Sequence, residues 1–366
     1  MAGLPQDLAG GLIISGWVGL CLILAEVAGR VFGFQAEHTR KFTHVGSGAI
    51  IFFTPWLLES VWSVGILCGG FAVVLTLSDK LGLLRSVHAV KRRTFGAYLY
   101  PIAVFTTYVL ADGDALLFQV AILVMALSDT VAALVGQRAG QVLYRVGDGN
   151  RSLEGSAAFF ALTFLLVMLS LVVAGRGVWP DLLLITLLVA LLATAVEAIS
   201  LMGFDNLLIP YSVVFILGRT LSLSLSDLGD WVLGMVMVLT VLLVTAWRVR
   251  LVATGFVLVA VVGYLAWVLA GPAWFFPLAG LYLAWVATRD LDSLPPEGVG
   301  VEAVFPMVAT AFTLLMLHAH TGWEGLYTPF VLSVGANALL AFGTPWRTRI
   351  MGTTSAGALG LLALLA

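Results

Sequence analysis

An aspartate within an apolar run is the residue of this sequence with the clearest chemical potential. Asp129 lies in the run 115–136, and a polar loop that ends in Arg151-Ser152-Leu153-Glu154-Gly155-Ser156 follows it. A carboxylate at membrane depth is costly, and such a group usually faces an interior cavity and takes part in function. We therefore expect the segment 125–157 to form part of a site.

Further acidic and basic side chains gather in three other places along the chain. In the first, spacings of three and four residues put an acid, an arginine and a histidine on one face of a helix. The second leads into an apolar run, and the third follows one. Their members are Glu37, Arg40, Lys41 and His44; Lys91, Arg92 and Arg93, ahead of Tyr100-Pro101; and Glu197, Asp205 and Asn206.

Cations and carboxylates in this combination suit phosphoryl transfer. Arginine, lysine and helix N-termini bind phosphates, whereas neighbouring carboxylates hold Mg²⁺ or take the proton of an attacking hydroxyl. The sequence contains neither the Gly-x4-Gly-Lys-Ser/Thr P-loop nor a protein-kinase signature. From the residues alone we infer an intramembrane enzyme that uses a phosphorylated substrate from the cytosol.

The composition decides which solvent the elements that position these residues must face. The chain is 61% hydrophobic and 10% charged over 366 residues, which is too apolar for an ordinary soluble core. Its apolar runs are of helical membrane-span length and lack the alternation of barrel strands. We predict an all-α, polytopic integral membrane protein of about fourteen transmembrane helices. The predicted segments are 9–29, 43–58, 61–78, 97–111, 115–136, 156–174, 182–201, 208–226, 231–247, 251–270, 272–287, 303–320, 325–342 and 350–366.

The distribution of lysine and arginine predicts how these helices are oriented. Basic residues follow the odd-numbered predicted segments, whereas the other loops are mainly acidic, with Arg176 as the basic exception. Because cytoplasmic loops carry the excess of positive charge, we expect the N-terminus outside and every polar cluster on the cytoplasmic side. The protein is then expected in a membrane, the cell membrane if the source is prokaryotic, with its active site facing the cytoplasm.

The polar clusters, taken in chain order, resemble the motifs of the polyprenol kinase family, which comprises the dolichol and phytol kinases. The resemblance covers roughly residues 20–225 and rests on five motifs in family order. It departs at Arg151, where the family usually has lysine, and at 207–209, where threonine and valine are usual. The matching residues are Glu37, Arg40, Lys41 and His44; Arg93-Thr94-Phe95-Gly96 with Tyr100-Pro101; Ser128-Asp129 with Ala132, Ala133, Gly136 and Gly140; Arg151 to Ser156; and Glu197 with Asp205, Asn206 and Pro210.

The resemblance implies CTP-dependent phosphorylation of a long-chain isoprenoid alcohol with a divalent metal, Mg²⁺ or another. The expected partners are the lipid alcohol, the nucleotide and membrane lipids, and no nucleic-acid polymer. We assign catalysis to Asp129, His44 and Glu197, with Asp129 or His44 as the base. We assign the metal to Asp129, Asp205 and Asn206. The residues assigned to the nucleotide and its phosphates are Arg40, Lys41, Arg93, Gly136, Gly140, Arg151, Ser152, Glu154, Gly155 and Ser156.

Several of these residues also have a simpler interpretation. Arg40, Lys41 and Arg93 could serve only to set membrane topology, and the Gly136-x3-Gly140 spacing is more often used in helix packing than in ligand binding. Two other classes of function are alternatives to a kinase. A lipid cytidylyltransferase would use CTP but transfer CMP to a lipid phosphate. The other alternative is a transporter or scaffold. A transporter or channel would be expected to have polar residues spread across the membrane depth, or broken helices in two related halves, whereas the polar residues of this sequence gather at the predicted inner ends of the helices.

The last third of the chain differs from the rest because its apolar runs contain few ionisable residues. We therefore predict a catalytic membrane domain over residues 1–227 and an accessory membrane helical domain over residues 228–366.

Overall fold

A computed structural model describes residues 4–84, 95–146, 149–200, 203–245, 248, 251–288 and 298–343. The chain forms two compact units, Met1–Leu225 and Ser226–Ala366, and each is described by itself. Every segment predicted as a helix up to residue 342 overlaps at least one helix, although 43–58 spans the break between two helices, and the last predicted segment, 350–366, lies outside the described residues.

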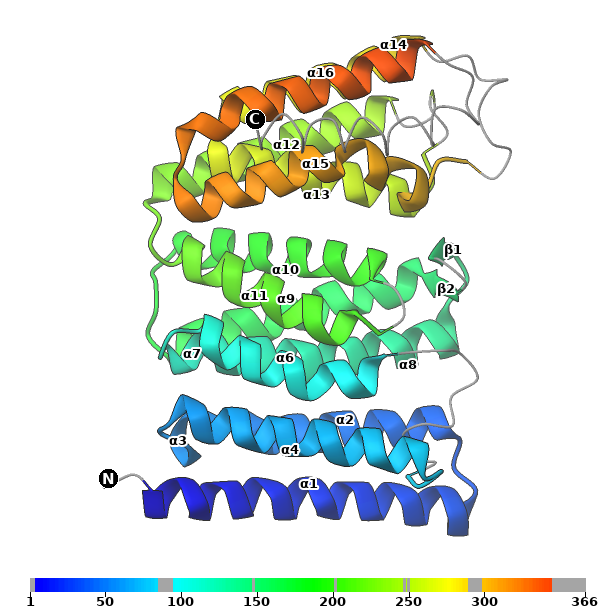
Figure 1. Ribbon diagram of the computed structural model, residues 1–366, viewed down its shortest axis with the longest axis vertical. Helices are drawn as coiled ribbons and strands as arrows, with labels where there is room; N and C mark the ends of the chain where they lie inside the picture. The colour runs from blue at the N-terminus through cyan, green and yellow to red at the C-terminus, as the bar shows by residue number, and fades with distance from the viewer. Residues whose placement is uncertain are drawn as a thin grey trace. The chain divides into compact units, whose positions relative to one another are not determined.

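The first unit is a bundle of roughly aligned helices (Figure 1). Three of its helices begin at side-chain caps, in which Ser60, Asp114 or Ser152 accepts a hydrogen bond from a backbone N–H of the first turn. The helices, in chain order, are α1 (Leu4–Phe32), α2 (Ala36–Ile51), α3 (Thr54–Leu57), α4 (Val61–Lys80), α6 (Gly96–Leu110), α7 (Ala115–Leu123), the π-helical turn η1 (Val124–Ser128), α8 (Asp129–Ala139), α9 (Leu153–Val173), α10 (Asp181–Ile199) and α11 (Asp205–Thr220).

Helices α7, η1 and α8 form one continuous span, Ala115–Ala139, that carries Asp129. The sequence predicts a regular helix here, but the structure widens it into a π turn over Val124–Ser128. Such turns insert into α-helices mostly as single turns and occur frequently at functional sites. The turn is packed tightly, since a Cβ at Gly48 of α2 would lie 2.5 Å from the Cβ of Ala126. The aspartate thus directly follows an irregular turn that is wedged against α2.

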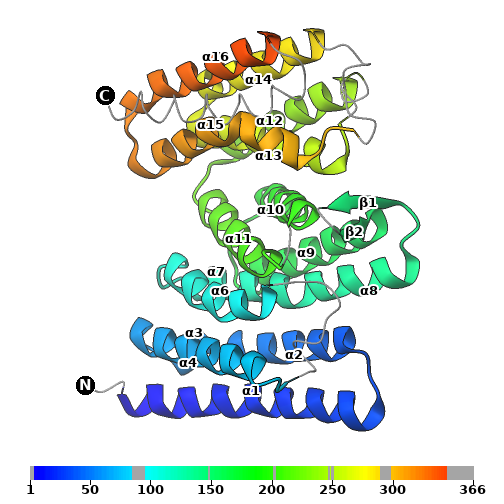
Figure 2. The ribbon, with the colours of Figure 1, turned by 45° about the vertical axis from the view of Figure 1, so that its right-hand side comes forward.

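A β-hairpin departs from the all-α prediction. Strand β1 (Leu143–Val146) pairs antiparallel with β2 (Gly149–Ser152), so that Tyr144 lies opposite Arg151. The hairpin occupies the polar loop between α8 and α9 (Figure 2). Its short, polar strands do not show the apolar alternation that identifies a strand in a sequence, which explains why the sequence pattern did not predict them.

The polar loops of the first unit gather at one end. The C-terminal end of α1, the start of α2, the end of α8 and the hairpin lie at the right of Figure 1. Basic residues occupy the last turns there, as with Arg30, Lys80 and Arg138. Acidic residues begin helices at the opposite end, as with Asp7 and Asp181. The side of the membrane that the basic end faces stays a prediction.

The second unit is helical throughout its described regular elements. Its core is apolar and aromatic, and His318 takes part in it by stacking on Trp274 at 4.5 Å. The His318 ring also donates from Nδ1 to the carbonyl of Trp323 (3.2 Å). The helices are α12 (Leu225–Thr245), α13 (Ala253–Ala270), α14 (Pro272–Thr288), α15 (Val301–Thr321), the 3-10 turn η4 (Glu324–Leu326) and α16 (Tyr327–Gly343).

Seven helices in the described part of the chain are long and apolar enough to cross a membrane. Three shorter apolar helices, Gly96–Leu110, Thr254–Ala270 and Pro272–Ala287, accompany them. The structure therefore supports an all-α membrane protein, whereas the number of fourteen spans is not confirmed. Large apolar side chains on the outside, such as Trp62 and Ile66, are typical of lipid-facing surfaces.

Candidate active site

The buried aspartate has partners on a neighbouring helix. Lys41 of α2 donates from Nζ to Asp129 Oδ2 at 2.5 Å and to the Asp129 carbonyl at 3.3 Å. The two side chains are only 7% and 10% exposed. A buried charge needs this kind of pairing and hydrogen bonding to be tolerated. The structure thus brings together two predicted site residues that are far apart in the sequence.

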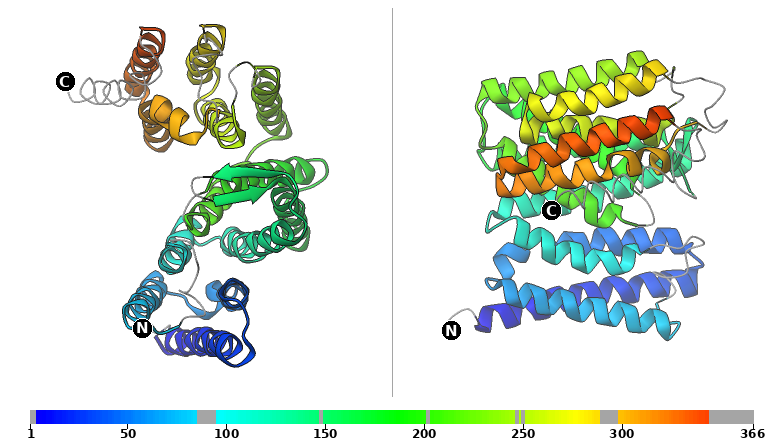
Figure 3. Two further views of the ribbon diagram at one scale, coloured as in Figure 1. Left: turned by 90° about the vertical axis from the view of Figure 1, so that its right-hand side faces the viewer. Right: turned by 45° about the horizontal axis from the view of Figure 1, so that its top comes forward.

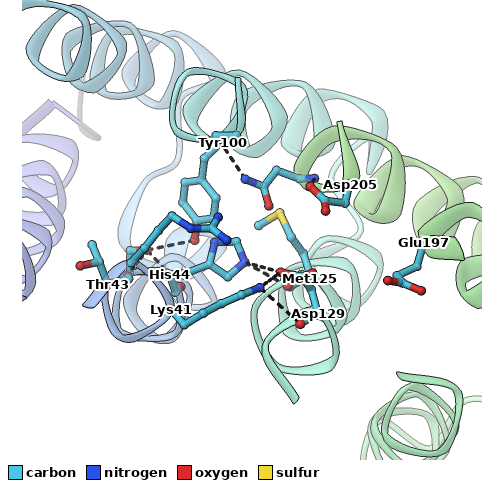
Figure 4. Close-up of polar contacts among 12 residues, drawn as sticks. Lys41, Thr43, His44, Tyr100, Met125, Asp129, Glu197 and Asp205 are labelled. Carbon is cyan, nitrogen blue, oxygen red and sulfur yellow. Dashed lines mark hydrogen bonds and ion pairs between the residues drawn. The ribbon is translucent and has the colours of Figure 1, made fainter. Parts of the chain in front are cut away.

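His44 lies beside the same carboxylate. Its Nε2 is 3.9 Å from Asp129 Oδ2 and 3.1 Å from the carbonyl oxygen of Met125, in the π turn. Because a carbonyl only accepts hydrogen bonds, Nε2 must carry a hydrogen in this contact. The ring also packs edge-on against Tyr100 at 4.9 Å. Figure 4 shows Lys41 and His44 pointing from α2 toward Met125 and Asp129.

Arg151 is the centre of a second charged cluster. From the hairpin it forms an ion pair with Glu197 of α10, and its Nη2 lies 3.3 Å from Asp205 Oδ2 of α11. The same Nη2 donates to the carbonyl of Ser200 at 3.0 Å. The guanidinium thereby fastens the end of the hairpin to the ends of two helices.

Ser156 and Tyr144 extend this cluster. The Tyr144 hydroxyl lies 2.7 Å from Ser156 Oγ, which in turn donates to Glu197 Oε2 at 3.3 Å. Residues opposite one another in an antiparallel pair project to the same side, so Tyr144 and Arg151 reach this network together. The sequence pattern does not single out Tyr144, because nothing in its spacing distinguishes it from other loop residues.

A large polar cavity lies between the two clusters and is lined by residues of both. Its volume is 890 Å³, and it is bounded by α2, α8, the hairpin, the start of α9 and the loop ahead of α11. This volume lies within the usual range of about 300–1,000 Å³ for ligand sites. The predicted site residues that line it are Arg40, Lys41, Asp129, Gly136, Arg151, Ser152, Gly155, Ser156, Glu197 and Asp205.

Three predicted residues hold structure around this cavity instead of lining it. Glu154 accepts a hydrogen bond from the Val142 backbone N–H (3.1 Å) and so fixes the start of the hairpin. Asn206 donates to the Gly96 carbonyl (2.9 Å) and faces a neighbouring apolar groove. A Cβ at Gly140 would lie 2.8 Å from the Cβ of Ser152.

The glycines that do line the cavity also have packing roles. A Cβ at Gly136 would lie 3.0 Å from Ser152 Oγ, and one at Gly155 would lie 2.9 Å from the Ala132 carbonyl oxygen. Ser152 in turn caps α9 by accepting from the Gly155 N–H at 3.1 Å. Gly136 of α8 and Gly155 of α9 therefore let the hairpin and α9 approach α8 closely, whatever they contribute to a ligand.

Arg40 lines both the polar cavity and the apolar groove and pairs with Glu37 at 2.6 Å. Arg93, which the sequence assigns to phosphate binding, lies outside the described residues. Within the described part of the chain, no group of three or more His, Cys, Asp or Glu side chains is placed to hold a metal ion. The assignment of a metal to Asp129, Asp205 and Asn206 stays a prediction.

Comparison with known proteins finds a similarity to a phytol kinase. The chain is 32% identical to the phytol kinase of Synechocystis sp. over 210 residues, which are 57% of this chain and 89% of that protein. No family model matches the chain. No solved structure matches it either.

Proposed function

Because the chain belongs to the polyprenol kinase family, in its phytol kinase-like form, we propose that it transfers the γ-phosphate of CTP to a long-chain isoprenoid alcohol. The observation that carries this proposal is the polar cavity with a buried carboxylate at its wall and cations on both sides. A nucleoside triphosphate needs cations around its phosphates, and the alcohol that receives the phosphoryl group needs a base to take its proton.

The reaction that we propose is a direct displacement. The alcohol oxygen attacks the γ-phosphorus, its proton passes to a carboxylate oxygen of Asp129, and the bond from the γ-phosphorus to the bridging oxygen breaks. CDP leaves with the electron pair, and the products are CDP and the prenyl phosphate. Positioning and charge neutralisation supply most of the acceleration in such transfers.

We favour Asp129 over His44 as the base. The nitrogen of His44 that lies nearest the carboxylate carries a hydrogen for the Met125 carbonyl, so that nitrogen is not free to accept a proton from the alcohol. His44 would instead hold the π turn and orient the carboxylate. Lys41, at 2.5 Å from Asp129, would move to the transferring phosphate as the proton arrives on the carboxylate.

Arg40 and Arg151 would neutralise the nucleotide phosphates from opposite sides of the cavity, with Arg93 as a third cation. The donors fit Mg²⁺, since two carboxylates, Asp129 and Asp205, line the cavity, and Mg²⁺ is commonly held by one or two carboxylates plus substrate phosphates. When held by these carboxylates, the ion would supply positive charge that offsets the charge of the nucleotide phosphates. Glu197 would keep Arg151 in place through their ion pair.

The distribution of charge supports a site on the cytoplasmic side of the membrane. Since basic loops face the cytoplasm in membrane proteins, the polar end of the first unit would face the cytosolic nucleotide pool, and the N-terminus would lie outside. The first unit would be the catalytic domain, because its 225 residues are enough to hold the 210 that match the relative. The second unit would be an accessory membrane domain.

A labelling experiment tests the proposal. The purified protein is given prenols and prenyl phosphates together with CTP that is labelled at either the α or the γ phosphate. We expect γ label in the alcohols and none in the prenyl phosphates. Transfer of α label to the prenyl phosphates would identify a cytidylyltransferase instead. No transfer of label from any nucleoside triphosphate would refute both activities.

A further inference from the structure

A narrow apolar groove lies between two pairs of helices in the first unit. Helix α1 packs along α2, α4 packs along α6, and the groove of 110 Å³ runs between these pairs. Figure 3 (left) shows the four helices end on. Side chains such as Ile14, Leu67, Phe71 and Val104 line it. The phosphoryl transfer proposed above uses none of these four side chains.

One end of the groove opens on the charged site. Arg40 lines both the groove and the polar cavity. His44 also lines the groove, and its Nε2 is 3.9 Å from the Asp129 carboxylate on the cavity side. The apolar wall of the groove is therefore followed, within the length of one side chain, by cationic side chains and by the carboxylate of Asp129, the proposed base. A molecule with an apolar tail and a reactive head could occupy both spaces at once.

The opposite end of the groove is closed by the short helix α3. Thr54, the first residue of α3, is buried and lines the groove. Helix α1 presses against the other end of α3, because a Cβ at Gly10 would lie only 2.1 Å from the carbonyl oxygen of Leu57. Along α4 the groove extends from Leu75 to Val64, a distance of roughly 16 Å for these eleven positions at about 1.5 Å each.

We propose that this groove binds the isoprenoid chain of the alcohol substrate, an inference that rests on the proposed function. The hydroxyl end lies at His44 and Asp129, and the deeper isoprene units lie beside Leu67 and Val64. An isoprene unit adds four carbon–carbon bonds of about 1.5 Å to the chain and roughly 5 Å to its extended length, so the groove spans about three units.

The chemistry of the wall selects this occupant. Burying hydrocarbon is favourable by about 25 cal/mol per Å², and the groove has little else to offer along most of its length. A nucleotide or a sugar phosphate would leave its polar groups unpaired there, at a cost of a few kcal/mol for each group. Because the volume is small, side chains must move apart to admit a branched chain. A larger side chain in the wall is therefore expected to weaken binding of the isoprenoid chain.

A matched pair of substitutions tests the groove. Leu67→Trp adds bulk to its wall about 12 Å from Leu75, whereas Ile66→Trp adds the same bulk at the adjacent position, which is 76% exposed. The kcat/KM of each purified variant is measured with CTP and alcohols of one, two and four isoprene units. For Leu67→Trp we expect a loss of about tenfold or more with the four-unit alcohol and a change of less than about twofold with the one-unit alcohol. Ile66→Trp should behave like the unsubstituted protein.

Other outcomes bear on the inference in distinct ways. An equal loss at every chain length, or no loss at the longest, would overturn it, and the latter is expected if the groove holds a bilayer lipid tail instead. If Leu67→Trp does not fold, Leu67→Ala replaces it, and its loss should again grow with chain length. Failure of the unsubstituted protein to phosphorylate any of the alcohols would refute the proposed function itself, before any variant is compared.

Discussion

Removing the charge of Asp129 while keeping its shape tests both the site and the buried ion pair. Asp129→Asn leaves Lys41, whose side chain is only 7% exposed, without its counter-ion. Breaking a buried pair by removing one partner costs about 3–5 kcal/mol. The lower end of that range applies here, because Lys41 still donates to the Asp129 main-chain carbonyl at 3.3 Å and the asparagine oxygen still accepts a hydrogen bond.

The expected effect is large enough to measure in detergent. A loss of about 3 kcal/mol corresponds to a fall in the Tm of the first unit of roughly 6–12 °C, at about 2–4 °C per kcal/mol for a unit of its 225 residues. Activity should fall by about 10²–10⁴, the usual contribution of general acid–base catalysis. Both quantities are measured on the same preparation, the first by thermal unfolding and the second by transfer of γ label to the alcohol.

A double variant separates stability from chemistry. Lys41→Met combined with Asp129→Asn removes both charges, and replacing both partners of a buried pair is often nearly neutral. We expect the double variant to recover at least half of the fall in Tm seen in Asp129→Asn, while its activity stays as low as that of Asp129→Asn. Glu26→Gln is the control, because its ion pair with Arg30 is of similar length (2.6 Å) but exposes 62% of the arginine side chain, and exposed pairs contribute about 0–1 kcal/mol.

Two results would refute this reasoning. Retention of most activity by Asp129→Asn would remove that carboxylate from the reaction. A double variant that is as unstable as the sum of its single variants would show that Lys41 and Asp129 do not stabilise each other, since coupled residues are expected to be non-additive.

Three further predictions concern the parts of the site around this pair. Arg151→Lys should keep activity but raise the KM for the nucleotide several-fold, because lysine lacks the fork that holds two carboxylates at once, and Arg151→Gln should lose more than about tenfold in kcat/KM. Gly48→Ala places a Cβ 2.5 Å from that of Ala126 and should lower both Tm and activity, whereas Gly69→Ala, with nothing within 4 Å, should change neither. Tyr144→Phe removes the bond to Ser156 (2.7 Å) and should lower Tm by the equivalent of about 1 kcal/mol, and an unchanged Tm would argue against that contact.

The helices of this chain were predictable because hydrophobic runs of span length specify them directly. The predicted segments 97–111 and 272–287, for example, match α6 and α14 almost residue by residue. The strands at 143–146 and 149–152 were not predictable, since their pairing depends on the register of a polar turn and on Arg151 reaching two helix ends. The predicted number of about fourteen membrane spans also exceeds the seven that the described helices support by length and composition.

The sequence singles out the residues of the candidate site but not the contacts between them. Asp129 and Lys41 stand out as ionisable residues in or beside apolar runs, and the structure pairs them across 88 positions of the chain. Their pairing depends on how α2 packs against the π turn, which no local pattern encodes. Conversely, the spacing of Gly136 and Gly140 favours both a ligand and a packing role, and only the position of Ser152 shows that packing uses both glycines.

The π turn at Val124–Ser128 gives the two halves of one span different rotational phases. Each residue of an α-helix turns the chain by about 100°, since there are 3.6 residues per turn, so one extra residue rotates everything after it by that amount. The half before the turn keeps Phe118 and Ile122 fully buried, as packing demands. In the half after the turn, the Asp129 side chain points toward α2 and pairs with Lys41. A single added residue thus lets one helix satisfy the apolar core in its first half and direct a charge in its second, with neither half out of register with its neighbours.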